Sequence, residues 1–131
     1  MSPITITDQP KKSIAIFDDD EDILSICSYI LTEQGWSVHT FNNCNHILDK
    51  LAPVHPTVIF MDNWIPDKGG VVATQILKNS PRFQNIPVIY FSANADIELL
   101  AQNAGADAYL AKPFNLEELA EVIDRVQAAV K

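Results

Sequence analysis

The segment 58–66 constrains the fold of this chain more than any other stretch. Four consecutive apolar residues (VIFM, 58–61) end at Asp62, and Pro66 follows four positions later. A short apolar run bounded by turn residues is typical of a strand buried on both faces, as in the centre of a parallel sheet. Such a strand would deliver Asp62 to the C-terminal edge of the sheet, where open parallel sheets bind their ligands. A carboxylate at that edge is costly without a partner, so Asp62 is a candidate site residue.

The rest of the chain alternates between short apolar runs and helical spacing. The apolar runs predict strands at 13–17, 57–61, 88–91 and 108–111, and the alternation of residues at 36–41 predicts a half-buried strand. The helical spacing predicts helices at 23–35, 43–51, 71–79, 96–104 and 116–129. For the last helix we expect Asn115 as N-cap and an apolar stripe of Leu116, Leu119, Ile123 and Val126. The alternation predicts the α/β class: a single doubly wound five-stranded parallel sheet flanked by five helices.

Length and composition predict one domain without a nucleic-acid partner. The 131 residues, 47% of them hydrophobic, suffice for a single core at 13–131 after a loose, flexible N-terminal tail at 1–12. The net charge is −8 and the longest basic run is Lys11-Lys12, which argues against binding to nucleic acid or an anionic membrane.

The cysteine spacing and the N-terminal segment predict a reduced, cytoplasmic protein. Cys27 and Cys44 lack metal or redox spacing, and the N-terminus lacks an apolar signal region. Since no apolar stretch approaches the roughly 20 residues that span a bilayer, we expect no membrane insertion.

Polar residues follow four of the predicted strands. Asp18 and Asp19 follow the first, Asp62 the third, Ser92 the fourth and Lys112 the fifth. In a parallel sheet these ends share one edge, where three carboxylates would repel one another unless a cation were bound. Oxygen ligands suit Mg²⁺ rather than zinc, with Mn²⁺ as an alternative. A lysine and a hydroxyl opposite the acids suit an added phosphoryl group, for which Asp62 is the natural covalent acceptor.

These motifs resemble those of the receiver domains of two-component response regulators, and the resemblance spans residues 13–129. The matching stretches are FDDD (17–20), MDNWIP (61–66), FSA (91–93) and YLAKPF (109–114). The resemblance implies a flavodoxin-like receiver domain over 13–131, with strand order 2-1-3-4-5. It is nearest to the single-domain regulators of chemotaxis.

The resemblance also implies a role for each motif residue. It makes Asp62 the phosphoacceptor, Lys112 and Ser92 its catalytic partners, and Ser92 and Tyr109 the switch residues. The metal ligands would be Asp18, Asp19, Asp62 and the backbone carbonyl of Trp64, and the Lys112–Pro113 peptide would be cis. A histidine kinase or histidine phosphotransfer protein would supply the phosphoryl group within a phosphorelay, and a downstream protein target would read the switched surface. The chain would then catalyse only its own phosphorylation and dephosphorylation, without separate substrate turnover.

Some of the acidic residues have a simpler structural explanation, and some positions depart from the family pattern. Asp20, Glu21 and Asp22 are expected to favour a helix dipole rather than to bind a ligand. Serine replaces the commoner threonine at 92, which predicts a looser switch. Trp64 and Asn94 border the approach of water to an acyl phosphate, so we expect them to lengthen its lifetime, unless the indole points into solvent.

A second family offers a rival function. The stretch IAIFDDD (14–20) also resembles phosphatases of the haloacid dehalogenase superfamily, in which Asp18 would be the nucleophile and Asp20 the general acid. Glu21-Asp22 replaces the usual Gly-Thr of that family, and no acidic Gly-Asp motif follows Lys112. The two functions differ in which aspartate, Asp62 or Asp18, traps beryllofluoride.

Overall fold

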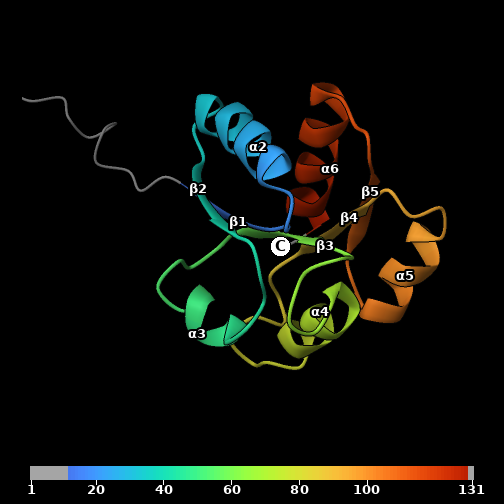
Figure 1. Cartoon of the computed structure of the whole chain (residues 1–131). Coiled ribbons are helices and arrows are strands. Elements are labelled where there is room, and N and C mark those ends of the chain that lie inside the picture. Colours follow the sequence, from blue (N-terminus) through green and yellow to red (C-terminus); the bar gives the residue numbers. More distant parts are fainter. Residues whose placement is uncertain (1–11, 130–131) are drawn as a thin grey trace, which may run out of the picture.

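Five strands form one all-parallel sheet with the order β2-β1-β3-β4-β5 (Figure 1), as expected. The computed structural model describes residues 12–129, so the tail expected at 1–12 lies outside the described residues except for Lys12. The strands are β1 (Ser13–Phe17), β2 (Ser37–Phe41), β3 (Val58–Asp62), β4 (Val88–Ser92) and β5 (Ala108–Ala111). The observed β3 lies one residue later than predicted and includes Asp62, because Asp62 pairs in register with Phe91 of β4.

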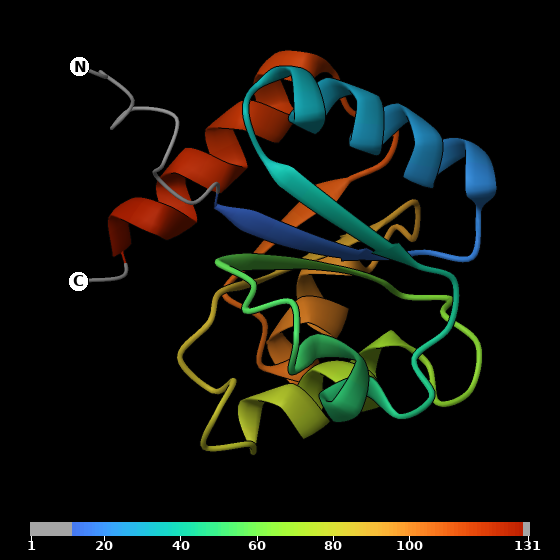
Figure 2. The same ribbon diagram turned by 90° about the vertical axis from the view of Figure 1, so that its left-hand side faces the viewer.

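Five helices connect the strands and cover both faces of the sheet. They are α2 (Glu21–Glu33), α3 (Ile47–Leu51), α4 (Gly70–Lys78), α5 (Ile97–Ala104) and α6 (Leu116–Ala129). Figure 2 shows α2 and α6 on one face and the other three helices on the opposite face. None of these helices is long and apolar enough to cross a membrane.

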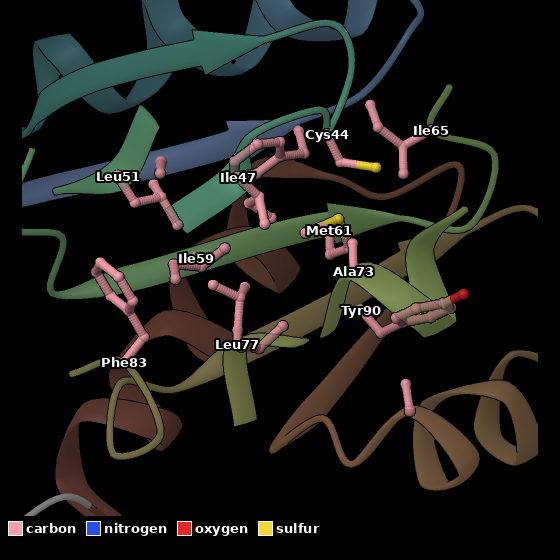
Figure 3. Packing of buried hydrophobic residues seen from close by; sticks show 14 of the residues in the cluster. Cys44, Ile47, Leu51, Ile59, Met61, Ile65, Ala73, Leu77, Phe83 and Tyr90 are labelled. Carbon is pink, nitrogen blue, oxygen red and sulfur yellow. The ribbon is translucent and has the colours of Figure 1, made fainter. Parts of the chain in front are cut away.

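The sheet separates two apolar cores. On β3, Ile59 and Met61 face α3, α4 and α5, whereas Val58 and Phe60 face α2 and α6. Figure 3 shows the first of these cores, in which Tyr90 of β4 is buried with Met61 and Ala73. Every residue of β3 and β4 is buried, which is the burial that the apolar runs predicted.

Helices α2, α4 and α5 lie within two residues of their predicted bounds, whereas α3 is shorter than predicted. The helix predicted at 43–51 begins only at Ile47, because the Asn43 side chain accepts from the Asn45 N–H at 3.1 Å and His46 is left-handed. Cys44 is held away from helical pairing, since its N–H donates to the Pro66 carbonyl at 3.1 Å.

The apolar stripe predicted for α6 is corrected at one position. Leu116 is 51% exposed, and Val122 joins Leu119, Ile123 and Val126 in the core. Asn115 caps α6 as expected: its Oδ1 accepts from the Glu118 N–H at 2.8 Å, and Glu118 Oε1 accepts from the Asn115 N–H at 2.9 Å.

Candidate functional site

The C-terminal ends of β1, β3, β4 and β5 meet at one edge of the sheet. There Asp18, Asp19 and Asp62 each offer a carboxylate oxygen, and these oxygens lie within 4.8 Å of one another. Asp18 and Asp62 are buried, whereas Asp19 is exposed. A shallow hollow of about 350 Å³ opens over them, and Trp64, Ser92, Asn94 and Lys112 also line it. The structure thus brings together the residues predicted at four separate strand ends.

Lys112 bridges two of the acids. Its Nζ donates to Asp18 Oδ2 at 2.6 Å and to Asp62 Oδ1 at 2.9 Å. Burial acts against the charged ammonium, but these two hydrogen bonds outweigh it and raise the pKa of Lys112. Lys112 therefore stays charged and partly neutralises the acids. The Lys112–Pro113 peptide is cis, as the resemblance implied.

Asp18 is fixed by the turn that joins β1 to α2. Its Oδ1 accepts from the Asp20 N–H at 2.9 Å, while its own N–H donates to the Phe41 carbonyl at 3.1 Å. Burial raises the pKa of Asp18, and the hydrogen bond from Lys112 offsets only part of this. Asp20 does more than favour the helix dipole, because its side chain caps α2 by accepting from the Asp22 N–H at 2.9 Å.

Asp62 is oriented by the loop that follows it. Its Oδ2 accepts from the Trp64 N–H at 3.1 Å, and its Oδ1 faces Lys112. The Trp64 side chain stands at the rim of the hollow and is 76% exposed. Asn94 also lines the hollow, and its Oδ1 accepts from the Asp96 N–H at 2.8 Å, so the oxygen of this amide is engaged within its own turn.

Ser92 lies inside the site and Tyr109 lies outside it. Ser92 is buried, and its Oγ accepts from the Asn94 N–H at 3.1 Å. Its backbone carbonyl accepts from the Lys112 N–H at 2.9 Å, which joins the ends of β4 and β5. Tyr109 is 42% exposed and lines a groove of about 660 Å³ with Glu98 of α5 and Arg125 of α6.

The site has a polar pair next to Asp62 that the sequence motifs did not predict. The hydroxyl of Tyr90 donates to Oδ1 of Asn63, the residue after Asp62. Burial, together with the nearby charge of Asp62, raises the pKa of Tyr90 to about 12, so this hydroxyl stays protonated and can donate. The one available signal was a tyrosine within the otherwise apolar run VIYF at 88–91.

The acidic cluster fits a hard divalent cation. It presents carboxylate oxygens from Asp18, Asp19 and Asp62 at one point, without a histidine or cysteine ligand among them. Lys112 supplies one positive charge against these three acids, so negative charge remains for a cation to balance. Oxygen ligands of this kind favour Mg²⁺ or Mn²⁺ over zinc.

Comparison with known sequences finds one family. The family described as "Response regulator receiver domain" matches residues 14–124. The chain is similar to Protein PilG of Pseudomonas aeruginosa, with 32% identity over 81% of this chain and 80% of that protein. It is also 32% identical to Regulatory protein AtoC of Escherichia coli over 86% of the chain.

The solved structures show the same fold. A CheY-like response regulator receiver domain protein from Methanospirillum hungatei superposes with a TM-score of 0.81 at 26% identity, covering 92% of this chain and 96% of that one. The chain spans about a quarter of the length of AtoC, since the match covers 24% of that protein.

Proposed function

Because the chain belongs to the family of response regulator receiver domains, we propose that Asp62 accepts a phosphoryl group from a phosphohistidine. The observation that carries this proposal is the placement of Asp62, which faces both the Lys112 ammonium and the carboxylates of Asp18 and Asp19. The fold and the receiver-domain function are those that the sequence predicted.

Asp62 and its neighbours each have a task in the transfer. An oxygen of Asp62 forms a bond to phosphorus while the P–N bond of the phosphohistidine breaks, and the imidazole takes up a proton as it leaves. Lys112 would bind an oxygen of the phosphoryl group, and the Ser92 hydroxyl would donate a hydrogen bond to another. When bound, Mg²⁺ or Mn²⁺ supplies positive charge for the phosphoryl oxygens. Asp18, Asp19, Asp62 and the Trp64 carbonyl would hold it.

The switch is the second part of the proposal. With a phosphoryl group on Asp62, Ser92 is drawn towards it and Tyr109 turns into the space beside Ser92. That movement would alter the surface of α5, β5 and α6, where Tyr109 now lines the groove. A downstream protein target would read this surface. The chain would catalyse its own phosphotransfer and dephosphorylation without turning over a separate substrate.

The proposed donor is a histidine kinase or a histidine phosphotransfer protein, and the proposed location is the cytoplasm. The net charge of −8 makes nucleic acid an unfavourable partner, because binding to phosphates needs a basic surface. No comparison supports the haloacid dehalogenase alternative. In the structure Asp18, its candidate nucleophile, is engaged by Lys112 through one oxygen and by the Asp20 N–H through the other.

Phosphorylation by acetyl phosphate in Mg²⁺ tests the proposal. We expect Asp62→Asn to abolish labelling, and the matched control Asp67→Asn, in the exposed part of the same loop, to label as the parent does. Beryllofluoride should be found on Asp62 in the parent. Full labelling of Asp62→Asn, or beryllofluoride on Asp18, would contradict the proposal.

A further inference from the structure

The loop that follows Asp62 is held by a hydrogen bond from a buried tyrosine to a half-buried asparagine. We define the acceptor loop as residues 63–69, between β3 and α4. The Tyr90 side chain is wholly buried in the core between the sheet and α4, and its hydroxyl donates to Oδ1 of Asn63. Figure 3 shows Tyr90 in this core with Met61 and Ala73. The first residue of the acceptor loop is therefore hydrogen-bonded through its side chain to β4, the strand that pairs with the end of β3.

A second contact anchors the backbone of the same residue. The Asn63 carbonyl accepts from the Gly70 N–H at 3.0 Å, which joins the first residue of the loop to the first residue of α4. The approach is close, because a Cβ on Gly70 would lie 2.2 Å from the Asp62 carbonyl oxygen. Asn63 is thus bound through its side chain by Tyr90 and through its backbone by Gly70.

The backbone conformation of Asn63 sets the positions of two backbone groups near Asp62, the Trp64 N–H and the Trp64 carbonyl. Asn63 stands between Asp62 and Trp64, whose N–H holds Asp62 Oδ2 at 3.1 Å. The Trp64 carbonyl is the proposed backbone ligand of the cation. A rotation of the backbone at Asn63 would move the donor and the carbonyl together. A side-chain hydrogen bond that prevents this rotation would preorganise the site, as outer partners of metal ligands do.

We infer that Tyr90 and Asn63 form a hydrogen-bonded clamp that positions the acceptor loop, which makes Tyr90 a positioning residue for phosphoryl transfer at Asp62. The inference rests on the proposed function and adds to it two residues that touch neither the phosphoryl group nor the cation. Tyr90→Phe removes the donor, whereas a substitution of Asn63 leaves the buried Tyr90 hydroxyl without its acceptor, which is the costly way to break a hydrogen bond.

The test is the substitution Tyr90→Phe, which keeps the ring and removes only the hydroxyl. Mg²⁺ binding is followed through the Trp64 amide resonance, and the phosphorylation rate is measured with acetyl phosphate at several Mg²⁺ concentrations. We expect Tyr90→Phe to weaken Mg²⁺ binding by about tenfold, the size of effect seen for outer partners of metal ligands. The matched control Tyr29→Phe removes a hydroxyl that is 71% exposed on α2 and should leave Mg²⁺ binding unchanged.

A double-mutant cycle separates positioning from mere stability. If the clamp acts as one unit, Asn63→Leu should weaken Mg²⁺ binding as Tyr90→Phe does, and the double variant should bind no more weakly than either single variant. Unchanged Mg²⁺ binding in Tyr90→Phe, even with a lower melting temperature, overturns the inference, as do two effects that simply multiply. If Tyr90→Phe fails to fold, the same measurement of Mg²⁺ binding is made with Asn63→Ala, which removes the acceptor of the hydrogen bond instead of the donor.

Failure of the clamp is distinguishable from failure of the proposed function. If the parent binds no Mg²⁺, or if Asp62→Asn is still labelled, the proposed function fails. If the parent binds Mg²⁺ and is labelled on Asp62, and Tyr90→Phe matches it in Mg²⁺ binding and rate, the clamp alone is wrong.

Discussion

The Nζ atom of Lys112 lies 2.9 Å from Oδ1 of Asp62, although 50 positions separate the two residues in the chain. This contact brings the lysine at the end of β5 to the acid at the end of β3, across the intervening strand β4. Because the same Nζ also bonds Asp18, one ammonium serves two buried carboxylates. The charge balance of the site in its metal-free form depends on this single side chain.

Lys112→Ala is expected to destabilise the metal-free protein. It leaves Asp18 and Asp62 buried and facing each other without a counter-charge, which costs about 3 kcal/mol when one partner of a buried ion pair is removed. Thermal unfolding at neutral pH should show the loss, and added Mg²⁺ should recover part of it. The control Lys68→Ala breaks an exposed pair with Asp67 and should change stability very little. Equal melting temperatures for the two variants would contradict this account.

Asp18→Asn is expected to have the opposite effect on the metal-free protein. Burial raises the pKa of Asp18 in the folded state, so the charged form is unfavourable there, even with the hydrogen bond from Lys112. The neutral amide removes this penalty, and each 1 kcal/mol gained would raise Tm by roughly 4 °C. Mg²⁺ binding should weaken in the same variant, because one carboxylate ligand is lost.

The difference in stability between Asp18→Asn and the parent should change with pH in one direction. A raised folded-state pKa means that protonation of Asp18 stabilises the fold at low pH, and this stabilisation is lost as pH rises through the folded-state value. The parent and Asp18→Asn should therefore differ most near pH 7 and converge as the pH falls towards the ordinary carboxyl range. Melting curves from pH 4 to pH 8 check this, and a gap that widens on acidification would refute it.

Ser92→Ala is expected to uncouple the site from the surface around Tyr109. Without the hydroxyl, a phosphoryl analogue on Asp62 has nothing to draw inwards, so Tyr109 should keep its exposed position. The measurement is the set of amide chemical-shift changes on α5, β5 and α6 when beryllofluoride binds. Ser92→Thr keeps a hydroxyl and serves as the control. If Ser92→Ala shows the same changes as the parent, the hydroxyl does not transmit the signal.

Trp64→Asn is expected to shorten the life of the aspartyl phosphate. The indole lines the hollow that contains Asp62, whereas the Asn94 amide, whose oxygen accepts from the Asp96 N–H, can orient a water but cannot act as a base. We expect dephosphorylation of the parent to be roughly tenfold slower than that of regulators built for rapid reset, which is about 1.4 kcal/mol of barrier. The control Trp64→Phe keeps an aromatic cover. Equal rates for Trp64→Asn and the parent would show that the 76% exposed indole does not shield the group.

Gly70→Ala is expected to disturb both the fold and the site. Its Cβ would lie 2.2 Å from the Asp62 carbonyl oxygen, so α4 or the acceptor loop must shift, at about 1–3 kcal/mol for an overpacked position. The phosphorylation rate at Asp62 should fall as well. The control Gly35→Ala suffers strain from a φ of +96° but meets no atom within 4 Å, so it should lower Tm without changing that rate. A parental phosphorylation rate for Gly70→Ala would contradict the prediction.

The sequence by itself determined the class of fold and the members of the site. Apolar runs of four or five residues mark the strands, because a strand covered on both faces must be apolar along its length. Polar residues directly after those runs then fall at one edge, because parallel strands end on the same side. For this reason Asp18, Asp62, Ser92 and Lys112 could be grouped before any coordinates were considered.

Only the tertiary structure decided how these residues are paired. That Lys112 bonds Asp18 and Asp62 together depends on the spacing of three strands, which no local pattern encodes. The short α3 also has a non-local cause, since Cys44 pairs with Pro66 from a distant loop. The contact of Tyr90 with Asn63 is likewise non-local, since the register pairs Tyr90 with Met61, two residues before Asn63, and 27 positions separate Tyr90 from Asn63 in the chain. Local sequence fixes which groups reach the edge of the sheet, whereas packing between distant segments fixes the distances at which they interact.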